Sequence, residues 1–149
     1  MPKNNGKTSE EIFEAYWDAR GKRSYYHRLM DTADVMGRVR RALGKAVPIA
    51  GLLPEQPSDY FVVDAEHGTM FAEVKSSQAK VSFPFSNIKR CQTRAAKRAL
   101  AAGGQYFFFI HALAHECWFK VPAQVILECE GASLKWSQLE KYRWTVSPK

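Results

Sequence analysis

Two segments rich in β-branched and aromatic residues lie on either side of a short turn near the middle of the chain. They are Tyr60–Val63 and Thr69–Val74, and the turn between them contains His67-Gly68. Strand-forming residues on both sides of a glycine-containing turn predict a β-hairpin. We expect the rest of the fold to be organised around this hairpin.

Polar residues interrupt the hairpin where a core strand would stay apolar. Asp59 opens the first segment, and Glu73 and Lys75 lie two residues apart near the end of the second. Side chains two residues apart on a strand point to the same face of a sheet, so one face gathers two carboxylates and an ammonium group. The pattern has two interpretations: an exposed hairpin with ordinary solvated charges, or a catalytic centre.

The catalytic interpretation is hydrolysis of a phosphodiester. Mg²⁺, or Mn²⁺ in its place, prefers carboxylate oxygens and completes its coordination with backbone carbonyls, water and substrate phosphate. Asp59, Glu73 and the backbone carbonyl of Val74 are the candidate ligands. Lys75, held beside the metal, would orient the attacking water and offset the negative charge that builds in the transition state.

The spacing of these residues resembles the PD-(D/E)XK motif of the restriction-endonuclease-like nucleases. Pro57 and Asp59 match its first half, and Glu73–Lys75 matches its second half. Gln92 follows 19 positions after Glu73, and then come a helical segment, two glycines and the apolar segment Tyr106–Ile110. This succession is similar to that of the RecU-type Holliday-junction resolvases.

The resemblance implies an α/β domain of the restriction-endonuclease-like class, with a mixed central β-sheet flanked by helices. It also implies a Mg²⁺-dependent endodeoxyribonuclease of branched DNA that acts as a homodimer in a bacterial or phage-infected cell. Asp59 and Glu73 would bind the metal, Gln92 would reach back from its helix to assist, and Lys75 would stabilise the transition state. An N-terminal helix of this family often lends a glutamate to the metal, which makes Glu14 a further candidate; a solvated helix charge is its other interpretation.

The sequence departs from the resembled family before Asp59. RecU-like resolvases carry a stalk there that engages the centre of the four-way junction, whereas this chain has a basic helical segment, Thr32–Gly44, and a Pro- and Gly-containing loop, Ala46–Gln56. Two other functions therefore stay open. One is a nickase, repair or restriction-type nuclease of linear DNA, and the other is a DNA-binding protein that cuts nothing.

Basic residues predict a DNA-binding surface. The helix expected over Asn87–Ala102 turns its apolar positions and Gln92 to one side, and its other side carries five cations: Lys89, Arg90, Arg94, Lys97 and Arg98. Arg38 and Arg41 add to the earlier basic segment. With 22 Lys and Arg against 15 Asp and Glu, a net charge of +7, contacts to a phosphate backbone are favoured over a merely solvated face.

Length predicts a single domain over residues 1–149, with residues 1–7 as a disordered tail, and the resemblance implies that this domain is a nuclease. No apolar run approaches the roughly 20 residues of a membrane span, so we expect a cytoplasmic protein. The remaining predicted elements are a helix over Ser9–Arg20, an extended segment Ser24–Leu29, strands over Gln105–His111 and Cys117–Val121, and a closing helix within Ser133–Tyr142. The aromatic and basic residues of Ser24–Leu29 are suited either to stacking on bases or to the edge of a sheet.

Overall fold

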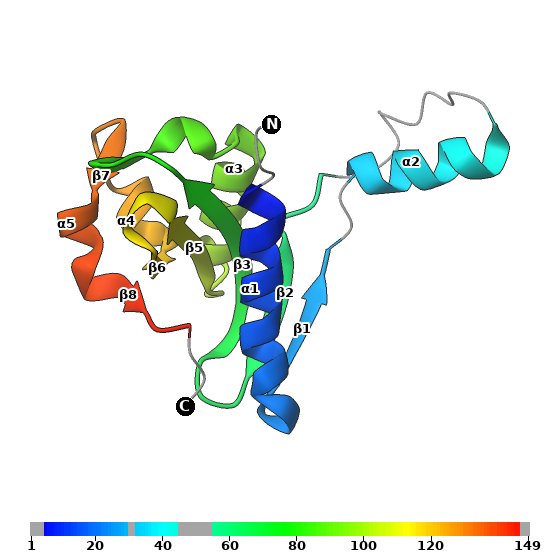
Figure 1. The fold of residues 1–149 in the computed structure, drawn as a ribbon, viewed down its shortest axis with the longest axis horizontal. Helices are drawn as coiled ribbons and strands as arrows, with labels where there is room; N and C mark the ends of the chain where they lie inside the picture. The colour runs from blue at the N-terminus through cyan, green and yellow to red at the C-terminus, as the bar shows by residue number, and fades with distance from the viewer. Residues whose placement is uncertain (1–4, 30–31, 45–54, 147–149) are drawn as a thin grey trace.

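A computed structural model describes residues 5–29, 32–44 and 55–146. Its centre is a six-stranded sheet of order β1-β2-β3-β5-β6-β8 (Figure 1). These strands are β1 (Ser24–Arg28), β2 (Tyr60–Asp64), β3 (Gly68–Ser77), β5 (Tyr106–Ala112), β6 (Cys117–Pro122) and β8 (Arg143–Trp144). β3 and β5 run parallel while the other neighbouring pairs are antiparallel, so the sheet is mixed, as predicted. A second sheet pairs β4 (Ser82–Pro84) with β7 (Ser133–Lys135).

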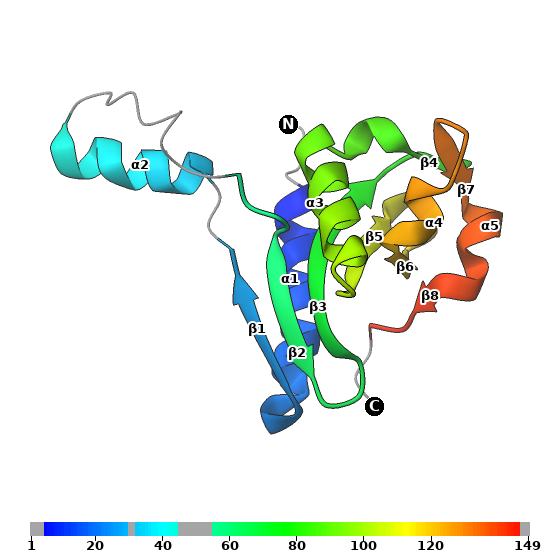
Figure 2. The same ribbon diagram turned by 180° about the vertical axis from the view of Figure 1, so that it is seen from behind.

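Helices flank the central sheet on both faces. They are α1 (Asn5–Ala19), α2 (Thr32–Leu43), α3 (Arg90–Ala101), α4 (Ala123–Leu127) and α5 (Trp136–Leu139). Figures 1 and 2 show α1 along one face and α3 and α4 over the other, with α2 extending away from the sheet. Among the described residues, no helix is long and apolar enough to cross a membrane.

The predicted hairpin is confirmed. β2 and β3 pair in an antiparallel register that places Tyr60 opposite Ala72. Gly68 closes the turn with a φ of +76°, a conformation that an L side chain adopts only at a cost. β3 continues beyond the predicted Val74 to Ser77 and pairs with β5 on its other edge, which places the EVK segment in the middle of the sheet.

Two hydrophobic cores hold the sheet between its helices. On one face, Phe13 and Trp17 of α1 pack with Tyr60 and Phe109. On the other face, Phe108 belongs to the core beneath α3 and α4. Neighbouring residues of β5 therefore lie in opposite cores, which confirms the prediction of a strand buried on both sides.

Several predicted boundaries are wrong. α1 begins at Asn5, so residues 5–7 belong to the helix and not to a disordered tail. α3 begins at Arg90 because Phe85–Asn87 forms a separate 3-10 turn. The predicted closing helix is divided: Ser133–Lys135 pairs with β4 as β7, and only Trp136–Leu139 is α-helical. The predicted loop over residues 46–56 lies mostly outside the described residues.

Candidate active site

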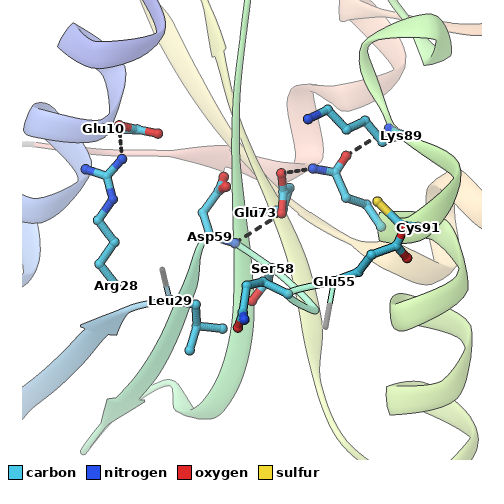
Figure 3. Close-up of a pocket in the computed structure, with 11 residues that line it drawn as sticks. Glu10, Arg28, Leu29, Glu55, Ser58, Asp59, Glu73, Lys89 and Cys91 are labelled. Atoms are coloured by element: carbon cyan, nitrogen blue, oxygen red, sulfur yellow. Dashed lines mark hydrogen bonds and ion pairs between the residues drawn. The ribbon is translucent and has the colours of Figure 1, made fainter. Parts of the chain in front are cut away.

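Four residues assigned to the site by the sequence lie together where β2 begins, and Figure 3 shows two of them, Asp59 and Glu73. Asp59 immediately precedes β2, Glu73 and Lys75 lie on β3, and Gln92 lies in the first turn of α3. The antiparallel register continues from Tyr60 opposite Ala72, so it brings Asp59 beside Glu73. The pairing of the hairpin thus positions both carboxylates.

Hydrogen bonds between the two strands fix the carboxylates in place. The backbone N–H of Val74 donates to Oδ2 of Asp59 at 2.9 Å. In return, the backbone N–H of Asp59 donates to Oε2 of Glu73 at 3.2 Å. Each strand therefore holds the carboxylate of the other, which limits the rotamers open to both side chains.

Glu73 is the most enclosed member of the site, with 1% of the residue exposed. Its Oε1 accepts a hydrogen bond from the side-chain amide of Gln92 and lies 3.0 Å from Nζ of Lys75. Oε1 of Gln92 accepts a hydrogen bond of 2.8 Å from the backbone N–H of Lys89, the N-cap residue of α3. Gln92 therefore links the start of α3 to the carboxylate of Glu73.

This environment disfavours a negative charge on Glu73. Burial, and after it the nearby charge of Asp59, raise the pKa of the Glu73 carboxyl to about 8, although the Lys75 ammonium opposes the rise. Two carboxylates held together in a poorly solvated place repel each other. A bound cation would relieve both the repulsion and the cost of burial.

The carboxylates open onto a cavity of about 350 Å³ that is lined by Asp59, Glu73 and Gln92 together with residues of α1, β1 and the start of α3. Glu10 enters from α1 and Arg28 from β1, while Lys89 lies at the start of α3 (Figure 3). The cavity is polar and open to solvent on one side, as a site for a large charged substrate must be.

The structure brings Glu10, and not Glu14, to the cavity. The carboxylate of Glu14 accepts a hydrogen bond of 2.7 Å from the hydroxyl of Tyr60. Glu10 lies 2.8 Å from Nη2 of Arg28; burial raises its pKa, Arg28 counteracts that rise, and the charge of Asp59 adds to it. Sequence reasoning missed Glu10 because it lies four residues from Glu14 on the same side of α1, and spacing alone does not distinguish the two.

The donor set suits a hard divalent cation that keeps much of its water. Asp59 and Glu73 offer carboxylate oxygens, which Mg²⁺ prefers. Among the described residues, no three His, Cys, Asp or Glu side chains form a cluster that would enclose a metal. The ligands beyond these two carboxylates would therefore be a carbonyl, water and substrate phosphate, as Mg²⁺ sites in phosphoryl-transfer enzymes commonly use.

The predicted cationic residues are all exposed, but they lie on two separate helices. The five on α3 and its N-cap, namely Lys89, Arg90, Arg94, Lys97 and Arg98, are all exposed. In the part of the chain that the structure describes, none of these five pairs with a carboxylate within 4.0 Å. Arg38 and Arg41 are exposed on α2, the helix that extends away from the sheet (Figure 2).

The fold is that of a known nuclease. No protein-family model matches the sequence, and no curated protein matches it. Among solved structures, the chain is similar to Hjc of Archaeoglobus fulgidus, a Holliday junction resolvase from an archaeal hyperthermophile, with 14% sequence identity and a TM-score of 0.54 over 90% of this chain and 91% of that chain. The prediction of a restriction-endonuclease-like α/β fold, with a mixed central sheet flanked by helices, is thereby confirmed.

Proposed function

We propose that this protein is a metal-dependent endodeoxyribonuclease that cuts phosphodiesters in branched DNA, in the manner of a Holliday junction resolvase. One observation carries the proposal: Asp59 and Glu73 line a solvent-open cavity beside a cationic helix, and Nζ of Lys75 lies 3.0 Å from Glu73. Among the described residues, the cations of that helix form no ion pair. The fold shared with a resolvase supports the same conclusion. The proposal includes a substrate of the kind that a RecU-type resolvase cuts.

Each residue of the site would have its own role in the reaction. Asp59, Glu73 and the carbonyl of Val74 would hold Mg²⁺ or Mn²⁺, which supplies Lewis-acid activation of phosphate and water. Lys75 has its ammonium group beside Glu73, where it would donate hydrogen bonds to the attacking water or to a phosphate oxygen as negative charge builds on it. Gln92 would keep the Glu73 carboxylate oriented, as partners of metal ligands commonly do.

Binding of DNA is assigned to the exposed cations. Of these cations on and before α3, Lys89 is the one that lines the cavity, and the others would continue the contact along the phosphate backbone. Symmetric cuts in two strands of a junction need two sites, so we also propose a homodimer. Arg38 and Arg41 on α2 would contact an arm of the DNA away from the cut.

The test is cleavage of a set of labelled DNA substrates: a four-way junction, a flap, a linear duplex and a single strand, each with Mg²⁺, Mn²⁺ or EDTA. Lys75→Met should lower the cleavage rate about 10²-fold or more, as removal of one transition-state donor does in other enzymes. Lys80→Met is the matched control, because Lys80 is exposed and lies outside the cavity. Circular dichroism melts of each variant separate lost chemistry from lost folding.

Symmetric cuts across the junction that require the metal would support the proposal. Cuts confined to linear DNA would replace the resolvase assignment with a nickase, repair or restriction-type nuclease. Tight binding without product from any of the substrates, with folded wild-type protein and either metal, would show that the chain is a non-cleaving DNA-binding protein.

A further inference from the structure

One face of the sheet beside the active site carries aromatic side chains, of which Tyr25 and His27 are exposed and Phe61 and Phe71 are half-buried. Along β1, β2 and β3, alternate residues point to the α3 side, and the register aligns His27 with Phe61 and Phe61 with Phe71. Tyr25 extends this row and is 61% exposed. We call Tyr25, His27, Phe61 and Phe71 the aromatic face. Figure 2 shows α1 behind these strands and α3 beside them, and neither lies over the near side of β1 and β2.

The aromatic face continues directly from the candidate active site. Phe71 and Glu73 are two residues apart on β3 and therefore point to the same side of the sheet. A hollow of about 450 Å³ is lined by Phe71, Cys91 and Gln56. Cys91 and Gln56 also line the cavity of the carboxylates. A strand of a substrate that leaves the carboxylates on this side would thus pass onto the aromatic rings.

The charge around the aromatic face suits a polyanion. The side chains that β1, β2 and β3 turn to this side, from Tyr25 to Phe71, include no carboxylate. Arg94 and Arg98 of α3 line the hollow beside Phe71, and Glu55 is the one acidic residue among the described residues that line it. Arg94 and Arg98 form no ion pair within the described part of the chain. Solvent-accessible aromatic rings beside such cations are the combination with which proteins hold single-stranded nucleic acid.

We propose that the aromatic face binds unpaired bases of a DNA strand next to the scissile phosphate, with Arg94 and Arg98 contacting its backbone. This inference rests on the proposed nuclease function and narrows its substrate class to branched DNA with unpaired bases next to the scissile phosphate. These bases are unpaired from the outset in a flap, and in a four-way junction the protein would have to open base pairs at the branch. A second copy of the chain is a poorer occupant. Each copy carries a charge of +7, and pairing these faces would bring arginines of like charge together, which opposes association.

The test measures binding in EDTA, so that cleavage does not interfere. Fluorescence anisotropy compares a blunt duplex with a duplex that carries a single-stranded tail and has the same number of phosphates. The tailed DNA should bind more tightly. Tyr25→Leu should weaken its binding about fivefold or more, the loss expected from one stacked base, and should leave the blunt duplex unchanged. Tyr25→Phe should keep the preference, because the ring remains.

A second readout reports stacking itself. 2-Aminopurine placed at the first unpaired position should be quenched on binding to wild type and to Tyr25→Phe, but not to Tyr25→Leu. Val81→Ser is the control for removal of an exposed apolar side chain, since Val81 is 70% exposed and lies outside the aromatic face.

Equal affinity for tailed and blunt DNA, or a tail preference that Tyr25→Leu leaves intact, would overturn the inference. So would sedimentation equilibrium in which Tyr25→Leu dissociates a dimer of the wild type, because the occupant would then be a second copy. Junction cleavage with Mg²⁺ is measured in parallel. Retained cleavage without any tail preference contradicts only this inference, whereas absence of cleavage by the wild type contradicts the proposed function.

Discussion

Replacing Glu73 with glutamine should stabilise the folded chain at alkaline pH while abolishing cleavage. Burial, and after it the charge of Asp59, raises the pKa of the Glu73 carboxyl from 4.5 to about 8. A carboxyl with a raised pKa binds its proton more tightly in the folded state. Its contribution to stability is therefore complete below the unfolded pKa and is lost as the pH rises towards the folded pKa. At about 1.4 kcal/mol per pH unit, the loss reaches about 4 to 5 kcal/mol.

Glutamine avoids this loss but introduces a smaller one. Its amide is neutral at every pH, so the cost of burying a charge disappears. However, its NH₂ group would replace Oε2, the atom that accepts a hydrogen bond from the backbone N–H of Asp59. The loss of a hydrogen bond of this kind costs about 1 kcal/mol. We expect Glu73→Gln to be about 3 kcal/mol more stable than wild type near pH 9 and about 1 kcal/mol less stable near pH 4.

Urea unfolding followed by tryptophan fluorescence, in EDTA and over this pH range, measures both values. The difference between wild type and variant isolates Glu73, because the other titrating groups are common to both proteins. Glu128→Gln is the matched control: Glu128 is exposed at the end of α4, and its substitution should change the free energy of unfolding little.

Magnesium extends the experiment to the metal site. A ligand that binds only the folded chain stabilises it by about 2.7 kcal/mol at a hundred times its Kd, so Mg²⁺ should restore wild-type stability near pH 8 and leave Glu73→Gln little changed. If the difference in free energy of unfolding between the two proteins does not change with pH, the argument that burial and repulsion raise the pKa of Glu73 is refuted. Equal stabilisation of both by Mg²⁺ would refute its assignment as a ligand.

Three further predictions concern other parts of the structure. Asp64→Asn should lower the free energy of unfolding by about 3 to 5 kcal/mol, because it leaves Arg20 without its buried partner at 2.7 Å. Burial alone would raise the pKa of Asp64, but Arg20 and two backbone N–H groups lower it to about 2. The stabilisation should thus be complete above the usual pKa of 3.8 and be lost as the pH falls towards 2 in an acid titration. Gln92→Leu should reduce cleavage or metal affinity about 10- to 100-fold, because Glu73 loses its amide partner. Arg94→Gln with Arg98→Gln should weaken duplex binding and reduce the slope of log K against log salt by about 0.9 for each phosphate that the protein no longer neutralises.

Each of these has a control in the chain. Glu140→Gln breaks an exposed ion pair with Arg143 and should change stability little, in contrast with Asp64→Asn. Gln124→Leu replaces an exposed glutamine of α4 and should leave cleavage intact. Arg143→Gln removes a cation that is already paired. An effect of Arg143→Gln on the salt slope as large as that of the α3 substitutions would contradict the assignment of the DNA surface to α3.

The hairpin and its site were predictable because they depend on local periodicity. Asp59, Glu73 and Lys75 interrupt strands whose period of two fixes the face of each side chain, and Gln92 follows from the helical spacing of α3. The partners of Gln92 were not predictable in the same way. Its amide binds Glu73 itself, and its oxygen binds the backbone of Lys89, because α3 begins three residues later than its apolar pattern indicates.

The features that the sequence did not predict depend on interactions between segments that are distant in the chain. Ser133–Tyr142 has a pattern that permits a helix, but pairing of Leu134 with Phe83 across β4 and β7 outweighs local propensity at its start. The ion pair of Arg20 with Asp64 joins residues 44 positions apart, and no local signal links them. The choice between Glu10 and Glu14 likewise depends on the packing of α1 against Tyr60, which spacing does not specify.

The double role of Gln92 makes the carboxylate site and α3 mechanically dependent on each other. One amide satisfies both Glu73 and the first turn of the helix that carries the exposed arginines. An ion or proton that changes the orientation of the Glu73 carboxylate would therefore also change the hydrogen bonds at the start of α3. A polyanion that shifts α3 would likewise change the orientation of Glu73. If a metal ion binds at the carboxylates and a nucleic acid binds to α3, thermodynamic reciprocity requires that each ligand change the affinity for the other by the same factor.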